Sequence, residues 1–280
     1  MKQLSLLVVI VVGLHGWCMS QDKSKNVIKS IHEAPVSHSE YKLIKGGRES
    51  AYDVKSGNIA ITPVFIDPVL SVAELAAFCS ESNSKGYNSI RFYPGLLDSS
   101  KVVLIMCAAK SSDSLERNYH ILKFGDYTNK FKLDTARATF DEALALHKAY
   151  LSMVRIDGKT QPAHGLTDSS FRKSRLYAVS EITTFLDSNI AVAGYGNYKI
   201  KFETGIVPDA LLDVFQGRFQ TGDRLYHKGF TVLMHILDEN HVPVINPYLE
   251  VDMNSPNPYK NLYLEVGNPC PPRCGVMHND

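Results

Sequence analysis

The chain has 280 residues, of which 44% are hydrophobic and 21% are charged, with 30 Lys plus Arg against 29 Asp plus Glu. This composition is typical of a globular protein, and it excludes a disordered chain, which has fewer apolar residues and a larger charge imbalance. The 18 Gly and 13 Pro follow no period, so a collagen-like chain is also excluded. Because the net charge is close to zero, the composition predicts no nucleic-acid partner and no binding to an anionic membrane.

The first twenty residues have the pattern of a secretory signal peptide, 1–20. Lys2 supplies a positive start, and an apolar run from Leu4 to Leu14 precedes the small residues Cys18 and Ser20. We therefore expect cleavage after Ser20 and an exported protein, either periplasmic or extracellular. Cleavage there leaves 260 residues with a formal charge of zero.

Two other membrane arrangements are less favoured. In a lipoprotein signal Cys18 would be acylated, but the bulky Trp17 lies where a small residue is expected. The apolar run is shorter than the about 20 residues that a membrane helix needs, and no later segment is long and apolar enough. The sequence therefore predicts a soluble mature protein with no transmembrane segment.

Three short patterns occur twice in the same order. Residues 72–78 and 179–185 resemble each other as helices, and residues 90–95 and 200–205 as strands that close on glycine. The third pattern is a second apolar strand, at residues 103–106 in the first half and 232–235 in the second. We interpret the order as an internal duplication, with a boundary near residue 130 and units at 21–130 and 131–280. The alternative is that two unrelated amphipathic helices share a common pattern.

Helix signals support this division. Ser71 and Glu74 form a capping-box pattern, which predicts a helix beginning at residue 72. A second helix is predicted from a cap at Asp134 to an end near Gly158. One face of that helix carries Ala136, Phe140, Ala143, Leu144, His147 and Leu151. We expect His147 to be a hydrogen-bonded core residue.

The C-terminal part has strand patterns. Residues 230–237 are almost entirely apolar, and a turn at 238–240 leads to 242–245, which reads as an edge strand because Pro243 lacks a backbone donor. Residues 262–266 alternate between apolar and other side chains, as a half-buried strand does. The predicted fold class is therefore α+β, with antiparallel sheets and packed helices.

Four cysteines remain after cleavage, and an even number in an exported chain suggests disulfides. Proximity favours Cys270 with Cys274 and Cys79 with Cys107, although other pairings are open. The first bridge requires a turn, because an extended Pro-Pro segment would hold its Cα atoms roughly 12 Å apart. For Cys79 and Cys107, two buried unpaired thiols are the alternative.

A resemblance rests on three segments: Ile90-Arg91-Phe92-Tyr93 leading to Gly95, the strand Val102 to Met106, and the terminal Cys270-Pro271-Pro272-Arg273-Cys274. Together they resemble a family of uncharacterised bacterial proteins, and they cover about a third of the chain. The present chain differs in being longer, exported and duplicated. The resemblance implies a structural unit, but no activity, cofactor or substrate.

No enzyme motif is present in the sequence: there is no nucleophile elbow, Walker loop, dinucleotide fingerprint or zinc helix. Cys270, Cys274 and His278 offer only three ligands in a proline-rich segment, so we predict no metal there. His235, Asp238 and His241 could converge at the predicted hairpin, but such a turn is too shallow for a catalytic pocket. We therefore predict no cofactor and no catalytic residue.

Arg91 and Lys201 occupy equivalent positions in the two repeats, each on a strand face opposite the apolar side chains. One interpretation is a charged, solvent-facing strand that resists edge pairing. The other is contact with an anion or carboxylate, which makes Arg91 and Lys201 candidate binding residues.

Two functions remain. The first is an exported, non-enzymatic binding or structural module with a protein or glycan partner, which the 14 tyrosines suit. The alternative is a secreted or periplasmic hydrolase, including a metal-assisted one, whose site is assembled from residues scattered in the sequence.

Overall fold

The computed structural model describes residues 34–56, 59–109, 121–124, 138–156, 159–160, 175–208, 210–211, 214, 229–252, 254–265 and 268–269. The predicted signal peptide, the predicted Cys270–Cys274 bridge and the metal candidate His278 lie outside these residues. All of the described residues belong to one compact unit, which includes parts of both predicted units.

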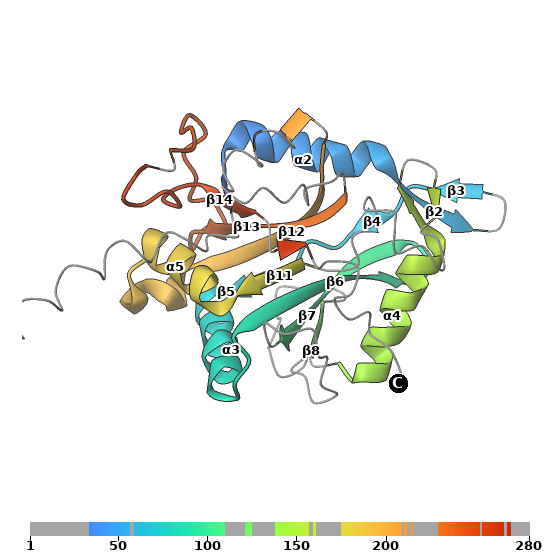
Figure 1. Ribbon diagram of the computed structural model, residues 1–280, viewed down its shortest axis with the longest axis horizontal. Coiled ribbons are helices and arrows are strands. Elements are labelled where there is room, and N and C mark those ends of the chain that lie inside the picture. Colours follow the sequence, from blue (N-terminus) through green and yellow to red (C-terminus); the bar gives the residue numbers. More distant parts are fainter. Residues whose placement is uncertain are drawn as a thin grey trace, which may run out of the picture. The chain divides into compact units, whose positions relative to one another are not determined.

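The fold is α+β, as predicted, and the described helices pack on antiparallel and mixed sheets (Figure 1). One sheet has the strand order β1-β14-β13-β12-β5, a second β10-β9-β2-β3, and a third β15-β11-β6-β7-β4, with β8 against β7. The pairing of β4 with β7 is parallel, and the others are antiparallel. Among the described residues, no helix is sufficiently long and apolar to cross a membrane.

Most of the described strands are short, with two to five residues each. They are β1 (Ala34–Val36), β2 (Tyr52–Ser56), β3 (Ile59–Ile61), β4 (Val64–Phe65), β5 (Val69–Ser71), β8 (Ile121–Phe124), β9 (Val154–Ile156), β10 (Lys159–Thr160), β11 (Arg175–Ala178), β14 (Tyr263–Glu265) and β15 (Asn268–Pro269).

Two long hairpins form the centre of the fold. β6 (Ser89–Leu97) pairs with β7 (Lys101–Ala109), and β12 (Lys199–Val207) pairs with β13 (Gly229–Leu237), in the same end-to-end register. A helix precedes each hairpin, α3 (Val72–Ser84) in the first half and α5 (Val179–Asn189) in the second. The order of helix, strand and strand is therefore the same in both halves.

The halves exchange a strand. β5, which leads into α3, pairs with β12, whereas β11, which leads into α5, pairs with β6. The first helical residue donates a backbone hydrogen bond across this exchange in both cases, Val72 to the Tyr198 carbonyl (3.0 Å) and Val179 to the Asn88 carbonyl (2.9 Å). These matching registers support the interpretation as an internal duplication, which stays a prediction.

The helix boundaries test the capping signals. α3 begins at residue 72 as predicted, because the Ser71 side chain accepts from the Glu74 backbone (3.1 Å) and the Glu74 carboxylate accepts from the Ser71 backbone (3.1 Å). The prediction of a helix from Asp134 to Gly158 was wrong at both ends. α4 (Phe140–Met153) begins after a second capping box at Thr139 and ends where β9 pairs with β2.

The predicted C-terminal hairpin was also partly wrong. Residues 242–245 form no strand but a single bridge between Leu237 and Pro243, because proline cannot extend the ladder and β13 pairs with β12 and β14 instead. The strand predicted at 262–266 is confirmed as β14, although both Tyr263 and Leu264 are buried.

The inner faces of the two hairpins share one apolar core. The Phe92 ring lies 5.5 Å from the Phe202 ring and 5.3 Å from the Tyr177 ring, and the Tyr177 hydroxyl donates to the Val232 carbonyl (2.5 Å). Each outer face is covered by a helix, with α2 (His38–Ala51) along β12 and α4 along β6 (Figure 1). The candidate site lies under α2.

Candidate functional site

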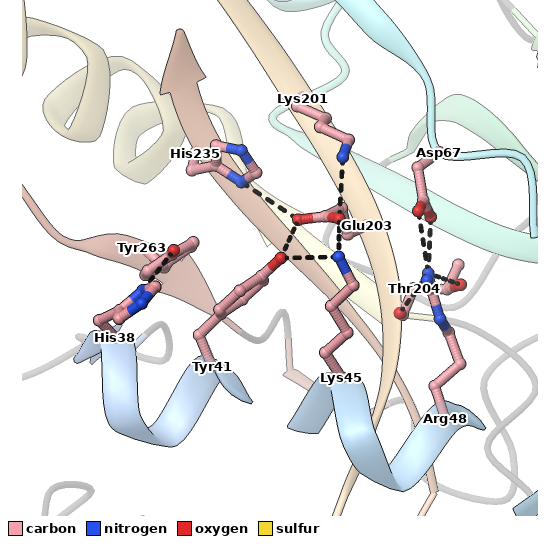
Figure 2. Close-up of polar contacts among 10 residues, drawn as sticks. All are labelled: His38, Tyr41, Lys45, Arg48, Asp67, Lys201, Glu203, Thr204, His235 and Tyr263. Atoms are coloured by element: carbon pink, nitrogen blue, oxygen red, sulfur yellow. Dashed lines mark hydrogen bonds and ion pairs between the residues drawn. The ribbon is translucent and has the colours of Figure 1, made fainter. Parts of the chain in front are cut away.

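A buried carboxylate, Glu203 on β12, is the centre of a polar cluster between α2 and the sheet (Figure 2). Its side chain is only 1% exposed. The Oε2 atom accepts from the Tyr41 hydroxyl (2.8 Å), and the Oε1 atom accepts from the ammonium groups of Lys45 (3.1 Å) and Lys201 (2.9 Å). Two cations from different elements therefore meet at one oxygen atom.

The helix α2 contributes several side chains of the cluster from one of its faces. Tyr41, Lys45 and Arg48 lie four and three residues apart, so they share the face that α2 turns towards the sheet. The helix begins at a cap in which the Glu40 carboxylate accepts from the Ser37 backbone N–H (2.9 Å). This cap fixes the first turn, from which Tyr41 extends.

The strands supply the other part through alternation. Lys201 and Glu203 are two residues apart on β12 and point to the same side of the sheet. His235 on β13 pairs with Lys201 in the register, and its Nδ1 atom lies 3.5 Å from Glu203 Oε2. The imidazole is buried beside the carboxylate.

The charges of the cluster follow from its pKa values. Burial alone would raise the pKa of Glu203, but Lys201, His235 and Lys45 outweigh it and lower this pKa to about 2. Burial lowers the pKa of His235 to about 4, against the opposing attraction of Glu203. Burial and the neighbouring Glu203 raise the pKa of Tyr41. At neutral pH the glutamate is ionised, and the histidine and tyrosine are neutral.

The two ammonium groups retain hydrogen-bonding capacity. A lysine has three N–H donors. Lys45 uses one on the Tyr41 hydroxyl (3.1 Å) and one on Glu203, and Lys201 uses one on Glu203. The side chains are 33% and 29% exposed, so the remaining donors can reach solvent or a ligand. With one carboxylate between two ammonium groups, this part of the cluster carries an excess positive charge.

Aromatic rings flank the carboxylate on one side (Figure 2). The Tyr41 and Tyr263 rings are stacked with centroids 4.2 Å apart, and His38 Nδ1 lies within hydrogen-bonding distance of the Tyr263 hydroxyl (2.9 Å). The His235 ring meets the Tyr263 ring edge-on at 5.2 Å. The rings therefore hold Tyr41 and His235 in place around Glu203.

A second ion pair ties the same helix to the sheet. Arg48 donates to both carboxylate oxygens of Asp67 (2.8 and 3.0 Å) and to the Thr204 carbonyl (3.1 Å). Its guanidinium also lies 4.5 Å from the Phe65 ring centroid. Burial raises the pKa of Asp67, although the Arg48 charge opposes this shift. The pair has a clear structural role in fixing α2.

The two predicted binding residues lie in different environments. Lys201 belongs to the cluster and is part-exposed, as its candidate role requires. Arg91 is 1% exposed, with its NH1 atom 3.5 Å from the Tyr93 hydroxyl, so the solvent-facing interpretation was wrong for Arg91. The alternation that predicted exposure could not show that α4 covers this face. A binding role for Arg91 stays a prediction.

The histidines and aspartate near the C-terminal turn do not form one site. His235 faces Glu203, whereas Asp238 accepts from the backbone N–H groups of Asn240 (2.9 Å) and Val242 (2.8 Å). His241 is exposed and lies beside Lys199. In the described part of the chain, no three His, Cys, Asp or Glu side chains group together as metal ligands would.

Cys79 on α3 and Cys107 on β7 are free and buried, which corresponds to the alternative of two thiols rather than to a disulfide. Burial raises the pKa of each thiol to about 12. His147 is a core residue as predicted, and its Nδ1 atom donates to the Pro94 carbonyl (2.8 Å).

Sequence reasoning missed most of the cluster. It identified Lys201, but not Glu203 two residues later, nor Tyr41 and Lys45 on a helix that precedes the first repeat. One sequence pattern could have identified Glu203: it follows Lys199 and Lys201 at every second position, so all three share one face of the strand. The partner helix lies more than 150 residues away in the sequence, and no local pattern joins the two.

Comparisons with protein-family models, with curated proteins and with solved structures gave no match to this chain.

Proposed function

We propose that this chain is an exported, non-enzymatic binding protein whose ligand carries an anionic group that Lys45 and Lys201 hold. The observation that carries this proposal is the convergence of two part-exposed ammonium groups on one buried carboxylate oxygen. An anion bound there would complete the hydrogen bonding of both lysines and balance their excess charge.

The fold itself does not require these charges. In the first hairpin, the register positions that correspond to Glu203 and His235 hold Tyr93 and Cys107. There the covering helix α4 packs on a cluster of neutral side chains, with Tyr93, Ile105 and Cys107 on the hairpin side. A buried ion pair seldom stabilises more than well-packed apolar residues would. A carboxylate at position 203, where the first hairpin has Tyr93, therefore favours a role in recognition.

The perturbed groups strengthen this interpretation. Ionisable side chains whose pKa values are shifted by burial and by specific charge partners are concentrated at functional sites. Here the carboxylate is held ionised and the histidine is held neutral by the same surroundings. The site thus presents a fixed charge pattern to a ligand across a wide range of pH. The export component rests on the signal-peptide pattern alone.

The proposal is tested by titrating the secreted, folded protein with inorganic phosphate at low ionic strength, with NMR chemical shifts or calorimetry as the readout. We expect saturable binding that Lys45→Gln and Lys201→Gln each weaken at least about tenfold, because each removes a charge-assisted hydrogen bond. Lys85→Gln is the matched control, since Lys85 forms a surface pair with Glu81 on α3. Equal effects of all three substitutions, or no saturable binding, would refute the site.

A further inference from the structure

We infer that the ligand carries two anionic groups and that Lys199 binds the second one. This inference rests on the proposed function and specifies its ligand class, a small flexible dianion such as a straight-chain dicarboxylate. The observation behind it is a third cation on the same strand face, paired with a neutral group instead of an acid.

Lys199 belongs to the same row as the cluster. It lies two residues before Lys201 on β12, so the two side chains leave the same face of the sheet about 7 Å apart along the strand. The residue between them, Ile200, is fully buried on the opposite face. The row therefore continues from the Lys45 and Lys201 pair to the first residue of the strand.

The contact of Lys199 leaves its charge uncompensated. Its ammonium group donates to the Nε2 atom of His241 at 2.6 Å, and an imidazole nitrogen that accepts a hydrogen bond is neutral. Among the contacts of the described residues, no carboxylate pairs with this lysine. The ammonium group has two further N–H donors.

The histidine that holds Lys199 is itself fixed. His241 has a φ of 62°, a left-handed conformation that is uncommon for a residue other than glycine. The nearby Asp238 carboxylate enforces the turn by accepting two backbone N–H groups, and Asp238 receives the His241 N–H at its carbonyl (3.0 Å). The Asp238 carboxylate is thus occupied by backbone N–H groups, and the turn presents the His241 imidazole to the lysine.

Two cationic centres on one rigid strand fit a ligand with two separated anionic groups. The Lys45 and Lys201 pair would bind one group, and Lys199 the other. Linking the two groups in one molecule makes the second contact intramolecular, so a dianion of matching length gains affinity over a monoanion without any new kind of contact. A ligand that is too short cannot reach both centres, and one that is too long loses the advantage.

The test is a calorimetric titration of the secreted protein with acetate and with straight-chain dicarboxylates from malonate to suberate, at low ionic strength. We expect an affinity optimum at an intermediate length, roughly tenfold or more tighter than acetate. Lys199→Gln should abolish this optimum and leave acetate binding unchanged. Lys85→Gln should preserve both, and thermal melting of each variant checks that it is folded.

The outcomes separate the two proposals. If acetate and phosphate bind but the dicarboxylates show no length optimum, or if Lys199→Gln leaves the optimum intact, the inference about Lys199 is wrong and the anion site stands. If neither acetate nor phosphate binds at the Lys45 and Lys201 pair, the proposed function fails as well.

Discussion

Gly205 on β12 lies directly beneath Ile44 on α2, and a Cβ atom at position 205 would overlap the Cγ2 atom of Ile44. Gly47 is similarly confined, because a Cβ atom there would come within 2.9 Å of the Ile206 carbonyl oxygen. These two glycines let the helix backbone approach the strand. That approach brings the helix side chains to Glu203.

We therefore expect Gly205→Ala to lower the free energy of unfolding by about 1–3 kcal/mol, because the buried Ile44 has little room to move. Chemical denaturation measures this. Gly46→Ala is the control: a Cβ atom at that exposed helical position meets nothing within 4 Å, and alanine should stabilise the helix by about 0.5–1 kcal/mol. If both substitutions stabilise the protein, the close contact between α2 and β12 does not exist.

Glu203→Gln should change stability and anion binding in opposite directions. The amide leaves two ammonium groups without their shared counter-charge, and we expect unfolding to become easier by about 2–3 kcal/mol. The same loss raises the positive charge of the cluster, so phosphate should bind more tightly. Glu81→Gln, which breaks a surface pair with Lys85, should change stability by less than about 0.5 kcal/mol. Unchanged stability of Glu203→Gln would contradict a buried, ion-paired carboxylate.

The pH dependence of stability should report on His235. Its folded pKa is about 4 and its ordinary value is 6.5, so the unfolded chain binds more protons between these values and stability rises with pH there. Glu203, with a folded pKa of about 2 against 4.5, extends the same trend to lower pH. The stability conferred by both groups is thus complete above about pH 6.5 and is lost on acidification.

His235→Gln isolates the upper part of this dependence. The difference in unfolding free energy between wild type and variant should grow by roughly 3 kcal/mol from pH 4 to pH 6.5, as measured by denaturant titration at a series of pH values. A slope shared by wild type and His235→Gln would show that the imidazole is not held neutral.

Local signals predicted local structure in this chain. The capping box at Ser71 placed the start of α3, and the alternating segments at 90–95 and 200–205 placed strands of both long hairpins. The start of α4 was predicted wrongly because two capping signals compete there. Asp134 is an acceptable cap, but Thr139 with Glu142 satisfies two backbone groups reciprocally, and the helix begins there.

The candidate site depended on non-local geometry, which the sequence does not encode in any short pattern. The packing of α2 on β12 places Tyr41 beside Glu203, 162 residues later in the chain. Arg91 and Lys201 match in sequence, yet their strands are covered differently. Arg91 is buried on β6, along which α4 lies, whereas Lys201 stays part-exposed beside α2. A strand pattern gives the two faces of a sheet but not what covers them.

The cysteines allow the export and thiol predictions to be tested together, by intact-mass measurement of secreted protein after alkylation at mild alkaline pH. Absence of residues 1–20 from the measured mass would support the signal peptide, and an uncleaved mass would contradict it.

In the native protein Cys79 and Cys107 should resist alkylation, because both are buried and their pKa values lie near 12. In denaturant without reductant both should be alkylated, and prior reduction should add Cys270 and Cys274 by opening their predicted bridge. If Cys79 and Cys107 stay unlabelled in denaturant until reductant is added, they are joined in a disulfide after all. If all four label without reductant, the terminal Cys-Pro-Pro-Arg-Cys segment is not bridged.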